Sequence, residues 1–257
     1  MADISQGNRL EGKVAVVTGA GSGFGAAIAK LFAAQGGQVV VADINVQGGE
    51  AVASAEPSRM HFLKLDVTSL EDWKAALDFV NSKWGHVDVL VNNAGTSYRN
   101  KPTLEVTQSE FDRCINVNVA SIYHSVNVFV PKFIEQKTGA SVINVSSIGS
   151  ERPRPGLVWY NASKGAVSNA TKGLAAEFGQ HNIRFNNLCP LLSGTGLFET
   201  FVGVPDTPEN RQKFIGNVPL GRLTDPNDVA YAALYLASDE GAFITGVSLE
   251  VDGGRAI

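Results

Sequence analysis

Tyr160 and Lys164 are the residues of this chain whose types and spacing most directly suggest chemistry. Residues four apart share one face of a helix, so the Lys164 ammonium can lie near the Tyr160 phenol. A free phenol has a pKa of about 10 and is a poor base at neutral pH, whereas a nearby cation stabilises the phenolate. The pair is therefore predicted to lower the pKa of Tyr160 and make it a general acid/base. A helical Tyr and Lys that share this spacing by chance is the alternative interpretation.

A glycine-rich stretch, residues 18–25, follows a short apolar run and precedes a segment with helical spacing. Glycines let the backbone turn sharply and approach a pyrophosphate, and a helix N-terminus offers free N–H groups and the positive end of its dipole. We therefore predict that this loop binds a dinucleotide. The cofactor contacts expected in it are Gly19, Ser22, Gly23, Phe24 and Gly25.

Asp43 ends the next apolar run, and Ile44 follows it. At that position a carboxylate can accept hydrogen bonds from both hydroxyls of an adenosine ribose, and it would repel a 2′-phosphate. Neither Ser22 nor Ile44 adds a cation beside it. The sequence therefore predicts NAD in preference to NADP. A solvent-facing Asp at a strand end is the alternative interpretation.

The elements that must position these residues alternate along the chain. Short apolar, β-branched runs cover residues 13–18, 38–43, 60–66, 87–93, 140–147, 183–189 and 247–252. Helical apolar spacing covers 24–36, 69–85, 109–136, about 160–178, and the segment after Asp225 or Thr224, either of which can cap it beside Pro226. This alternation predicts right-handed βαβ crossovers in an α/β, doubly wound parallel sheet.

We expect one domain over residues 1–257, because no linker-like stretch interrupts the pattern. The least regular part, about 191–217, is rich in Gly, Pro and Phe, and it is predicted to form a lid over the substrate.

Together the motifs resemble the classical short-chain dehydrogenase/reductase family over essentially the whole chain. The resemblance rests on Thr18-Gly-x-x-x-Gly-x-Gly25, Asn92-Asn93-Ala94-Gly95, Ser147 and Tyr160-Asn161-Ala162-Ser163-Lys164, in this order and spacing. It implies a Rossmann-like sheet of about seven parallel strands with the active site at their carboxyl ends. It also implies a homotetramer, with contacts through the small residues of the 160–178 helix and through 253–257.

The resemblance assigns catalytic roles beyond Tyr160 and Lys164. Ser147 would hydrogen-bond the substrate oxygen, with Ser146 as the adjacent alternative. Asn118 would hold a water in a proton relay through Lys164, with Asn116 as its neighbour in the pattern and a purely structural amide as the alternative interpretation.

Further cofactor contacts also follow from the resemblance. Asp66 and Val67 would contact the adenine, unless Asp66 only caps the following helix. The other implied contacts are Asn93, Ala94, Gly95, Tyr160, Lys164, Pro190 and Thr195.

Two positions depart from the family's pattern. Phe24 replaces the usual Ile or Leu of the glycine loop, which is expected to alter packing beside the cofactor. Cys189-Pro190-Leu191 stands where Pro-Gly is common, so Leu191 puts the local backbone path in doubt.

The substrate pocket is expected where the motifs meet the carboxyl edge of the sheet. The predicted substrate contacts are Ser97, Ser147, Trp159, Tyr160, Leu191 and Leu192, with Phe198 and Phe201 added by the lid. Apolar side chains and hydroxyls together suit a polyol, a sugar or a cyclic alcohol. Arg152 and Arg154 could meet an anionic group, although solvent exposure is the commoner place for loop arginines.

The predicted function is therefore an NAD-dependent oxidoreductase that interconverts a secondary alcohol and a ketone or lactone by hydride transfer. A 3-oxoacyl-thioester reductase is the alternative; it would usually want NADPH and a basic residue near Ser22 or Ile44, and Asp43 argues against it. A catalytically silent NAD-sensing or scaffold protein is the alternative from another class. Intact Ser147, Tyr160 and Lys164 argue against that one.

Composition and charge argue against a nucleic-acid-binding, a membrane or a metal-binding protein. With 257 residues and a formal net charge of −4, the chain lacks the basic excess typical of nucleic-acid binding. It has no signal-peptide-like apolar core and no apolar run long enough to span a membrane, so a cytoplasmic protein is expected. Cys114 and Cys189 lie far apart, which predicts buried thiols and no metal site.

Overall fold

The structure, a computed structural model, describes residues 6–193 and 198–257. One parallel sheet runs through the described residues, in the order β3-β2-β1-β4-β5-β6-β7. Its strands are β1 (Val14–Thr18), β2 (Gln38–Asp43), β3 (Met60–Lys64), β4 (Val89–Asn92), β5 (Ala140–Val145), β6 (Ile183–Pro190) and β7 (Ser248–Val251). The predicted doubly wound sheet of seven parallel strands in a single domain is confirmed.

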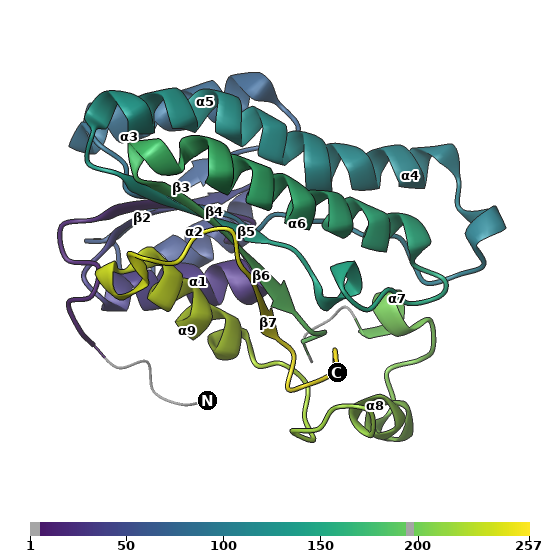
Figure 1. The fold of residues 1–257 in the computed structure, drawn as a ribbon. Helices are drawn as coiled ribbons and strands as arrows, with labels where there is room; N and C mark the ends of the chain where they lie inside the picture. The colour runs from purple at the N-terminus through teal and green to yellow at the C-terminus, as the bar shows by residue number, and fades with distance from the viewer. Residues whose placement is uncertain (1–5, 194–197) are drawn as a thin grey trace.

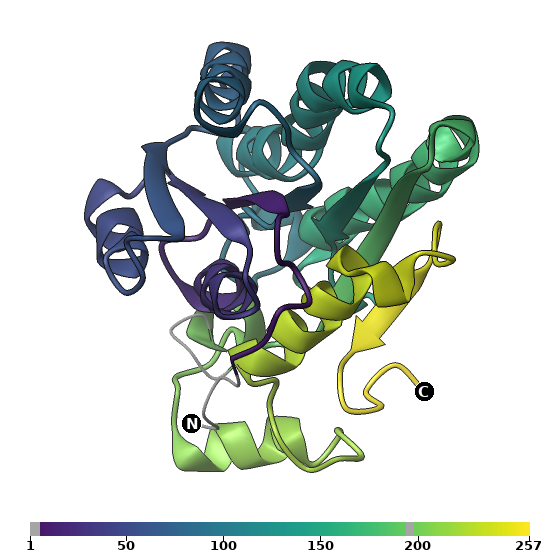
Figure 2. The same ribbon diagram turned by 90° about the vertical axis from the view of Figure 1, so that its left-hand side faces the viewer.

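Helices cover both faces of the sheet (Figure 1). On one face lie α1 (Gly23–Ala34), α2 (Val46–Ala53) and α9 (Pro226–Ala237). On the other lie α3 (Leu70–Trp84), α4 (Gln108–Ile115), α5 (Ser121–Gln136) and α6 (Val158–Phe178). Figure 2 shows α1 and α9 side by side beneath the sheet. The short helices α7 (Phe198–Val202) and α8 (Pro208–Ile215) extend beyond the carboxyl ends of the strands.

Strands β1 and β2 are mainly apolar because both of their faces are buried. In β1, Val14 and Val16 pack in the α3–α5–α6 layer, whereas Ala15 and Val17 pack in the α1–α9 layer. Successive side chains of a strand point to opposite faces, so one short run serves both layers of the core.

The helix expected over 109–136 is divided. A π turn, Asn116–Ala120, separates α4 from α5, and a π turn inserts an extra residue that apolar spacing does not reveal. The sequence pattern also missed α2, a short helix whose N-cap Asn45 accepts a hydrogen bond from the Gly48 N–H. The expected start of α9 is confirmed, with Asp225 as N-cap.

The strand order reverses at β1, which lies between β2 and β4. Loops leave these strands in opposite directions at such a point and open a crevice at the carboxyl ends. Among the described residues, no helix is long and apolar enough to cross a membrane.

Candidate active site

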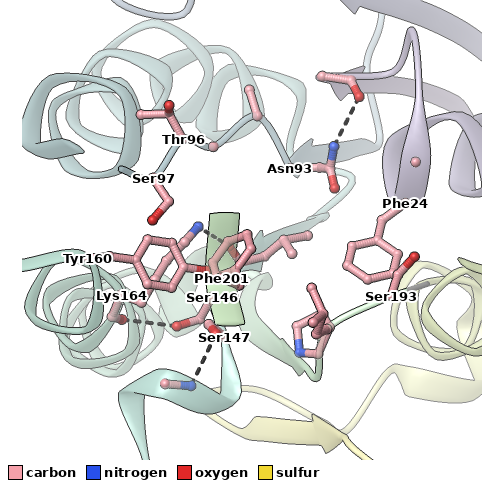
Figure 3. A pocket seen from close by; sticks show the side chains of 18 of the residues that line it. Phe24, Asn93, Thr96, Ser97, Ser146, Ser147, Tyr160, Lys164, Ser193 and Phe201 are labelled. Atoms are coloured by element: carbon pink, nitrogen blue, oxygen red, sulfur yellow. Dashed lines mark hydrogen bonds between the residues drawn. The ribbon is translucent and has the colours of Figure 1, made fainter. Parts of the chain in front are cut away.

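A pocket of about 1010 Å³ occupies this crevice (Figure 3). It is at the upper end of the size range for ligand sites and has room for more than one small molecule. The predicted site residues that line it are Gly19, Ser22, Gly23, Phe24, Asp43, Ile44, Asp66, Val67, Asn93, Ala94, Gly95, Ser97, Ser147, Tyr160, Lys164, Pro190, Leu191 and Leu192. Thr195 lies outside the described residues.

The glycine loop meets the geometry that a pyrophosphate needs. Gly19 and Gly23 have φ of +63° and +55°, where a side chain would be strained. Ser22 is the N-cap of α1 but makes no side-chain cap hydrogen bond, and the first turn carries no acidic residue. The first N–H groups of α1 therefore remain available to an anion. Gly25 does not line the pocket; a Cβ there would collide with the Gly19 carbonyl.

Asn93 ties the loops after β1 and β4 together. Its Nδ2 donates to the carbonyls of Thr18, at 2.8 Å, and Gly19, at 3.2 Å. The Thr18 hydroxyl in turn accepts from the backbone N–H groups of Asn93 and Ala94. These bonds hold the glycine loop against the carboxyl end of β4. Asn93 therefore stabilises the shape of the pocket.

Asp43 faces the pocket with a fixed carboxylate. One oxygen accepts from the Gly21 N–H and the other from the Asn45 N–H, each at 2.8 Å. Two oxygens, each with a further lone pair, suit a ribose diol. Asp66 also lines the pocket and accepts from Thr68, whereas the N-cap of α3 is Ser69, so the capping alternative for Asp66 is wrong.

Tyr160 is buried on α6, with its ring edge-on to Phe201 at a centroid distance of 5.1 Å. Burial raises the pKa of its phenol to about 12, against the opposite effect of a hydrogen bond with Ser147. The predicted lowering of this pKa is therefore wrong for the chain by itself, because desolvation of the phenolate outweighs the other effects.

Lys164 lies one helical turn beyond Tyr160, as the spacing predicted. Its Nζ donates to the Val145 carbonyl at 2.8 Å, and a Cβ on Gly95 would lie 3.2 Å from it. Burial lowers the pKa of Lys164 to about 8. Burial thus shifts the pKa of each group toward its neutral form, but with a pKa of about 8 Lys164 stays mostly an ammonium at neutral pH. A charged ligand would have a large effect on both groups.

The structure distinguishes the two adjacent serines (Figure 3). Ser146 bonds to the Lys164 carbonyl and the Ser168 hydroxyl, each at 2.9 Å, and so braces α6 against β5. Ser147 lines the pocket beside Tyr160 and accepts from the Gly149 N–H at 3.0 Å, which leaves its own proton to be donated. This arrangement favours Ser147 as the substrate-binding hydroxyl.

Asn118 is buried in the π turn and is not among the lining residues. Its Oδ1 accepts from the Thr96 N–H, and its Nδ2 donates to the Thr96 carbonyl and the Ser163 hydroxyl. These contacts fit the alternative interpretation, a structural amide that positions Thr96 on the pocket wall, and the role of Asn118 in a proton relay stays a prediction.

Trp159 is a further predicted site residue that does not line the pocket. Its ring is edge-on to Phe111 at 5.4 Å, and it is 37% exposed. It directly precedes Tyr160, and its side chain points about 100° away around the helix, toward Phe111. At Leu191, where the sequence put the backbone path in doubt, the pairing with β7 continues: its N–H donates to the Val251 carbonyl, and its side chain packs with Ile148.

Sequence reasoning missed several lining residues. They are Arg113, Leu157, Thr200, Phe214 and Arg255. Phe201 lines the pocket as expected of the lid, whereas Phe198 is buried in a cluster with Phe214. Arg255 stands in no motif and is brought to the site by the fold, because the chain returns to it after β7.

Comparisons with known proteins identify the family of the chain. The profile of the family described as enoyl-(acyl carrier protein) reductase matches residues 19–256. A 4-formylbenzenesulfonate dehydrogenase from Comamonas testosteroni is 45% identical over 96% of this chain and 99% of its own. A 3-oxoacyl-(acyl-carrier-protein) reductase from Thermotoga maritima is 36% identical over 97% and 100%.

A solved structure gives the same result for the fold. The 3-ketoacyl-(acyl-carrier-protein) reductase from Brucella melitensis, crystallised with NADH, is 42% identical and superposes with a TM-score of 0.91. The match covers 96% of this chain and 99% of that one.

Proposed function

Because this chain belongs to the short-chain dehydrogenase/reductase family, we propose that it is an NAD-dependent oxidoreductase that interconverts a secondary alcohol and the corresponding ketone or lactone. The observation that carries the proposal is the meeting of Ser147, Tyr160 and Lys164 in one pocket with the glycine loop and Asp43. The NADH in the similar Brucella structure supports the cofactor.

In the oxidation of an alcohol, Tyr160, Ser147 and Lys164 each have a separate role. Bound NAD supplies the acceptor for the hydride that leaves the alcohol carbon with both electrons of the C–H bond. Tyr160 takes the hydroxyl proton, and Ser147 donates a hydrogen bond to the same oxygen as it becomes a carbonyl. The Lys164 ammonium favours the phenolate form of Tyr160. Reduction of the ketone reverses each step, with Tyr160 as the acid.

The wall near Tyr160 favours a ring-shaped substrate. Leu157, Leu191 and Phe201 line this part of the pocket. These side chains offer apolar surface and few hydrogen-bond partners, which suits a cyclic alcohol better than a polyol or a sugar.

A substrate panel with absorbance of reduced nicotinamide as the readout tests the proposal. We expect NAD-linked oxidation of cyclic secondary alcohols such as cyclohexanol. Reduction of acetoacetyl thioesters faster than of any simple ketone would instead identify a 3-oxoacyl-thioester reductase. Asp43 alone does not exclude that enzyme, because the similar Brucella reductase is an NADH complex. Cofactor binding with no turnover of any compound would identify a silent NAD-binding protein.

The carboxylate of Asp43 is expected to set the cofactor preference. The parent protein should bind NADH at least about tenfold more tightly than NADPH, because the 2′-phosphate is repelled. Asp43→Asn should reduce this ratio to near unity, and fluorescence titration of both cofactors measures it. Asp66→Asn is the control, since a residue at the adenine should weaken both cofactors equally. Equal affinities in the parent would contradict the ribose-diol role.

The assembly is proposed to be a homotetramer. On α6, Ala162, Ala166 and Ala170 form an exposed line of small side chains that permits close contact with a second helix, whereas Ala175 is buried within the subunit. The second contact would use residues 253–257, which follow the edge strand β7. Light scattering should give four times the mass of one chain, and a monomer at micromolar concentration would contradict this assembly. A cytoplasmic location likewise stays a prediction.

A further inference from the structure

We propose that the substrate carries an anionic group, a carboxylate or a sulfonate, which binds between Arg154 and Arg255 at the end of the pocket away from the adenosine site. The inference rests on the proposed function, because it assigns the substrate class of the same pocket. Two segments far apart in the sequence build this subsite: the loop before α6 and the chain that follows β7.

The guanidinium groups at this end of the pocket have no carboxylate partners within the described part of the chain. Arg152, Arg154 and Arg255 all line the pocket, and none of them takes part in an ion pair there. The arginines that do form ion pairs in the described residues are Arg9, Arg59, Arg211 and Arg222. Within the described residues, the positive charge at this end of the pocket is therefore not neutralised by an ion pair with an Asp or Glu side chain.

Arg255 carries the strongest sign of a missing partner. Its Nη1 is buried, and it has no hydrogen-bond partner among the described residues. A buried charged donor without an acceptor is costly, so an acceptor supplied by a ligand would recover that free energy.

Arg154 stands beside it. Its guanidinium lies over the Phe214 ring at 5.1 Å from the centroid, and Phe214 itself lines the pocket. This contact holds the guanidinium plane at the pocket wall, where its donors suit an oxyanion.

The like charges also repel one another. Burial, and then the charge of Arg255, lowers the pKa of Arg154; burial, and then the charge of Arg152, lowers the pKa of Arg255. Asp252 opposes this at Arg255, but its carboxylate already accepts from the backbone N–H groups of Gly254 and Ala256. A bound anion would offset the repulsion that remains.

Arg152 links the two segments. It donates to the carbonyl of Arg255 at 2.5 Å and to the Ile257 oxygen at 3.3 Å. The loop before α6 and the chain after β7 are therefore held side by side, and Arg154 and Arg255 keep their positions without a direct bond to each other.

Charge is distributed unevenly along the pocket. The carboxylates that line it, in the described residues, are Asp43 and Asp66, both at the carboxyl ends of β2 and β3. Arg152, Arg154 and Arg255 lie at the other end, beside Ile148 and Phe214, whereas Arg113, which also lines the pocket, donates to the Ser97 carbonyl. A substrate with one anionic end and one alcohol would be oriented by this difference, with its alcohol toward Tyr160.

Matched substrates test the subsite. Rates with 4-hydroxycyclohexanecarboxylate and with its carboxamide are compared at saturating NAD. The parent should prefer the carboxylate by roughly ten- to hundredfold in kcat/KM, mainly through KM, because charge-assisted hydrogen bonds form only with the anion. Arg154→Gln and Arg255→Gln should each lose most of this preference, because the carboxylate rate falls much more than the carboxamide rate. Arg99→Gln, an exposed arginine that does not line the pocket, should keep the preference.

A binding measurement separates this proposal from the proposed function. Calorimetric titration with cyclohexanecarboxylate and cyclohexanecarboxamide needs no turnover, and near-ultraviolet circular dichroism checks that each variant is folded. Carboxylate binding that is lost in Arg255→Gln, together with no oxidation of either alcohol, would keep the anion subsite and remove the dehydrogenase proposal. Equal binding of the two compounds to the parent, or carboxylate binding unchanged in both arginine variants, would overturn the subsite.

Discussion

Tyr160→Phe is expected to lower turnover by roughly a hundredfold to ten-thousandfold, or about 3 to 5 kcal/mol of barrier, while the affinity for NAD barely changes. The substitution keeps the ring and its edge contact with Phe201 but removes the proton that must move. Because the ring and its packing are kept, the Phe variant should fold about as well as the parent. Measurement of kcat with a working alcohol and of NAD affinity by calorimetry checks both parts.

Tyr98→Phe is the matched control. Tyr98 is also buried, but its hydroxyl accepts from the Trp159 N–H and does not line the pocket. Losing that hydroxyl should cost about 1 kcal/mol of stability and leave turnover within a few-fold of the parent. If Tyr160→Phe kept more than about a tenth of the parental turnover, another group would have to transfer the proton.

The pH profile of the parent gives the same residue a second test. Oxidation needs the phenolate of Tyr160, and the pKa of this phenol is raised in the chain by itself. Alcohol oxidation should therefore rise toward alkaline pH and ketone reduction should fall. The residual rate of Tyr160→Phe should show neither slope.

Lys164→Met is expected to damage turnover and cofactor binding together. Turnover should fall at least about a hundredfold, because the phenolate loses its cation, and NAD should bind roughly tenfold more weakly. The second effect follows from the family resemblance, in which this ammonium also bonds the nicotinamide ribose. Lys172→Met, an exposed lysine on the same helix, is the control. Undiminished NAD affinity in Lys164→Met would remove the cofactor role of the lysine.

The pH dependence of the free energy of unfolding tests whether Lys164→Met removes the buried ionisable group and leaves the protein folded. In the folded chain the pKa of Lys164 is lowered from 10.5 to about 8, so between these values the unfolded state binds more protons. The free energy of unfolding of the parent should therefore rise with pH across this window, and the part due to Lys164 should be absent in Lys164→Met. Denaturant unfolding of both proteins at pH 8 and above measures this difference.

The sequence by itself predicted the features that depend on neighbouring residues: the buried strands, the glycine loop and the shared helix face of Tyr160 and Lys164. The apolar runs predict strands buried on both faces, because alternate residues of a strand such as β1 pack into the helix layers on opposite sides of the sheet. The glycine loop predicts its own backbone, since Gly19 and Gly23 adopt positive φ that other residues resist. Tyr160 and Lys164 share a helix face by spacing alone. Each of these properties depends on residues close together in the chain.

Burial and long-range contact decided the rest. The pKa of Tyr160 depends on how completely the fold removes water from the phenol. The four-residue spacing of Tyr160 and Lys164 carries no information on this burial. Asn118 is engaged by Thr96 and Ser163, which only the packing of α6 on the π turn brings to it. Arg255 reaches the pocket because β7 lies beside β6 and directs the following chain toward the loop before α6. The sequence determined the Tyr160–Lys164 pair and the glycine loop, whereas the tertiary structure alone determined that Arg255 joins Arg154 at the pocket, because these residues come from segments that meet only on folding.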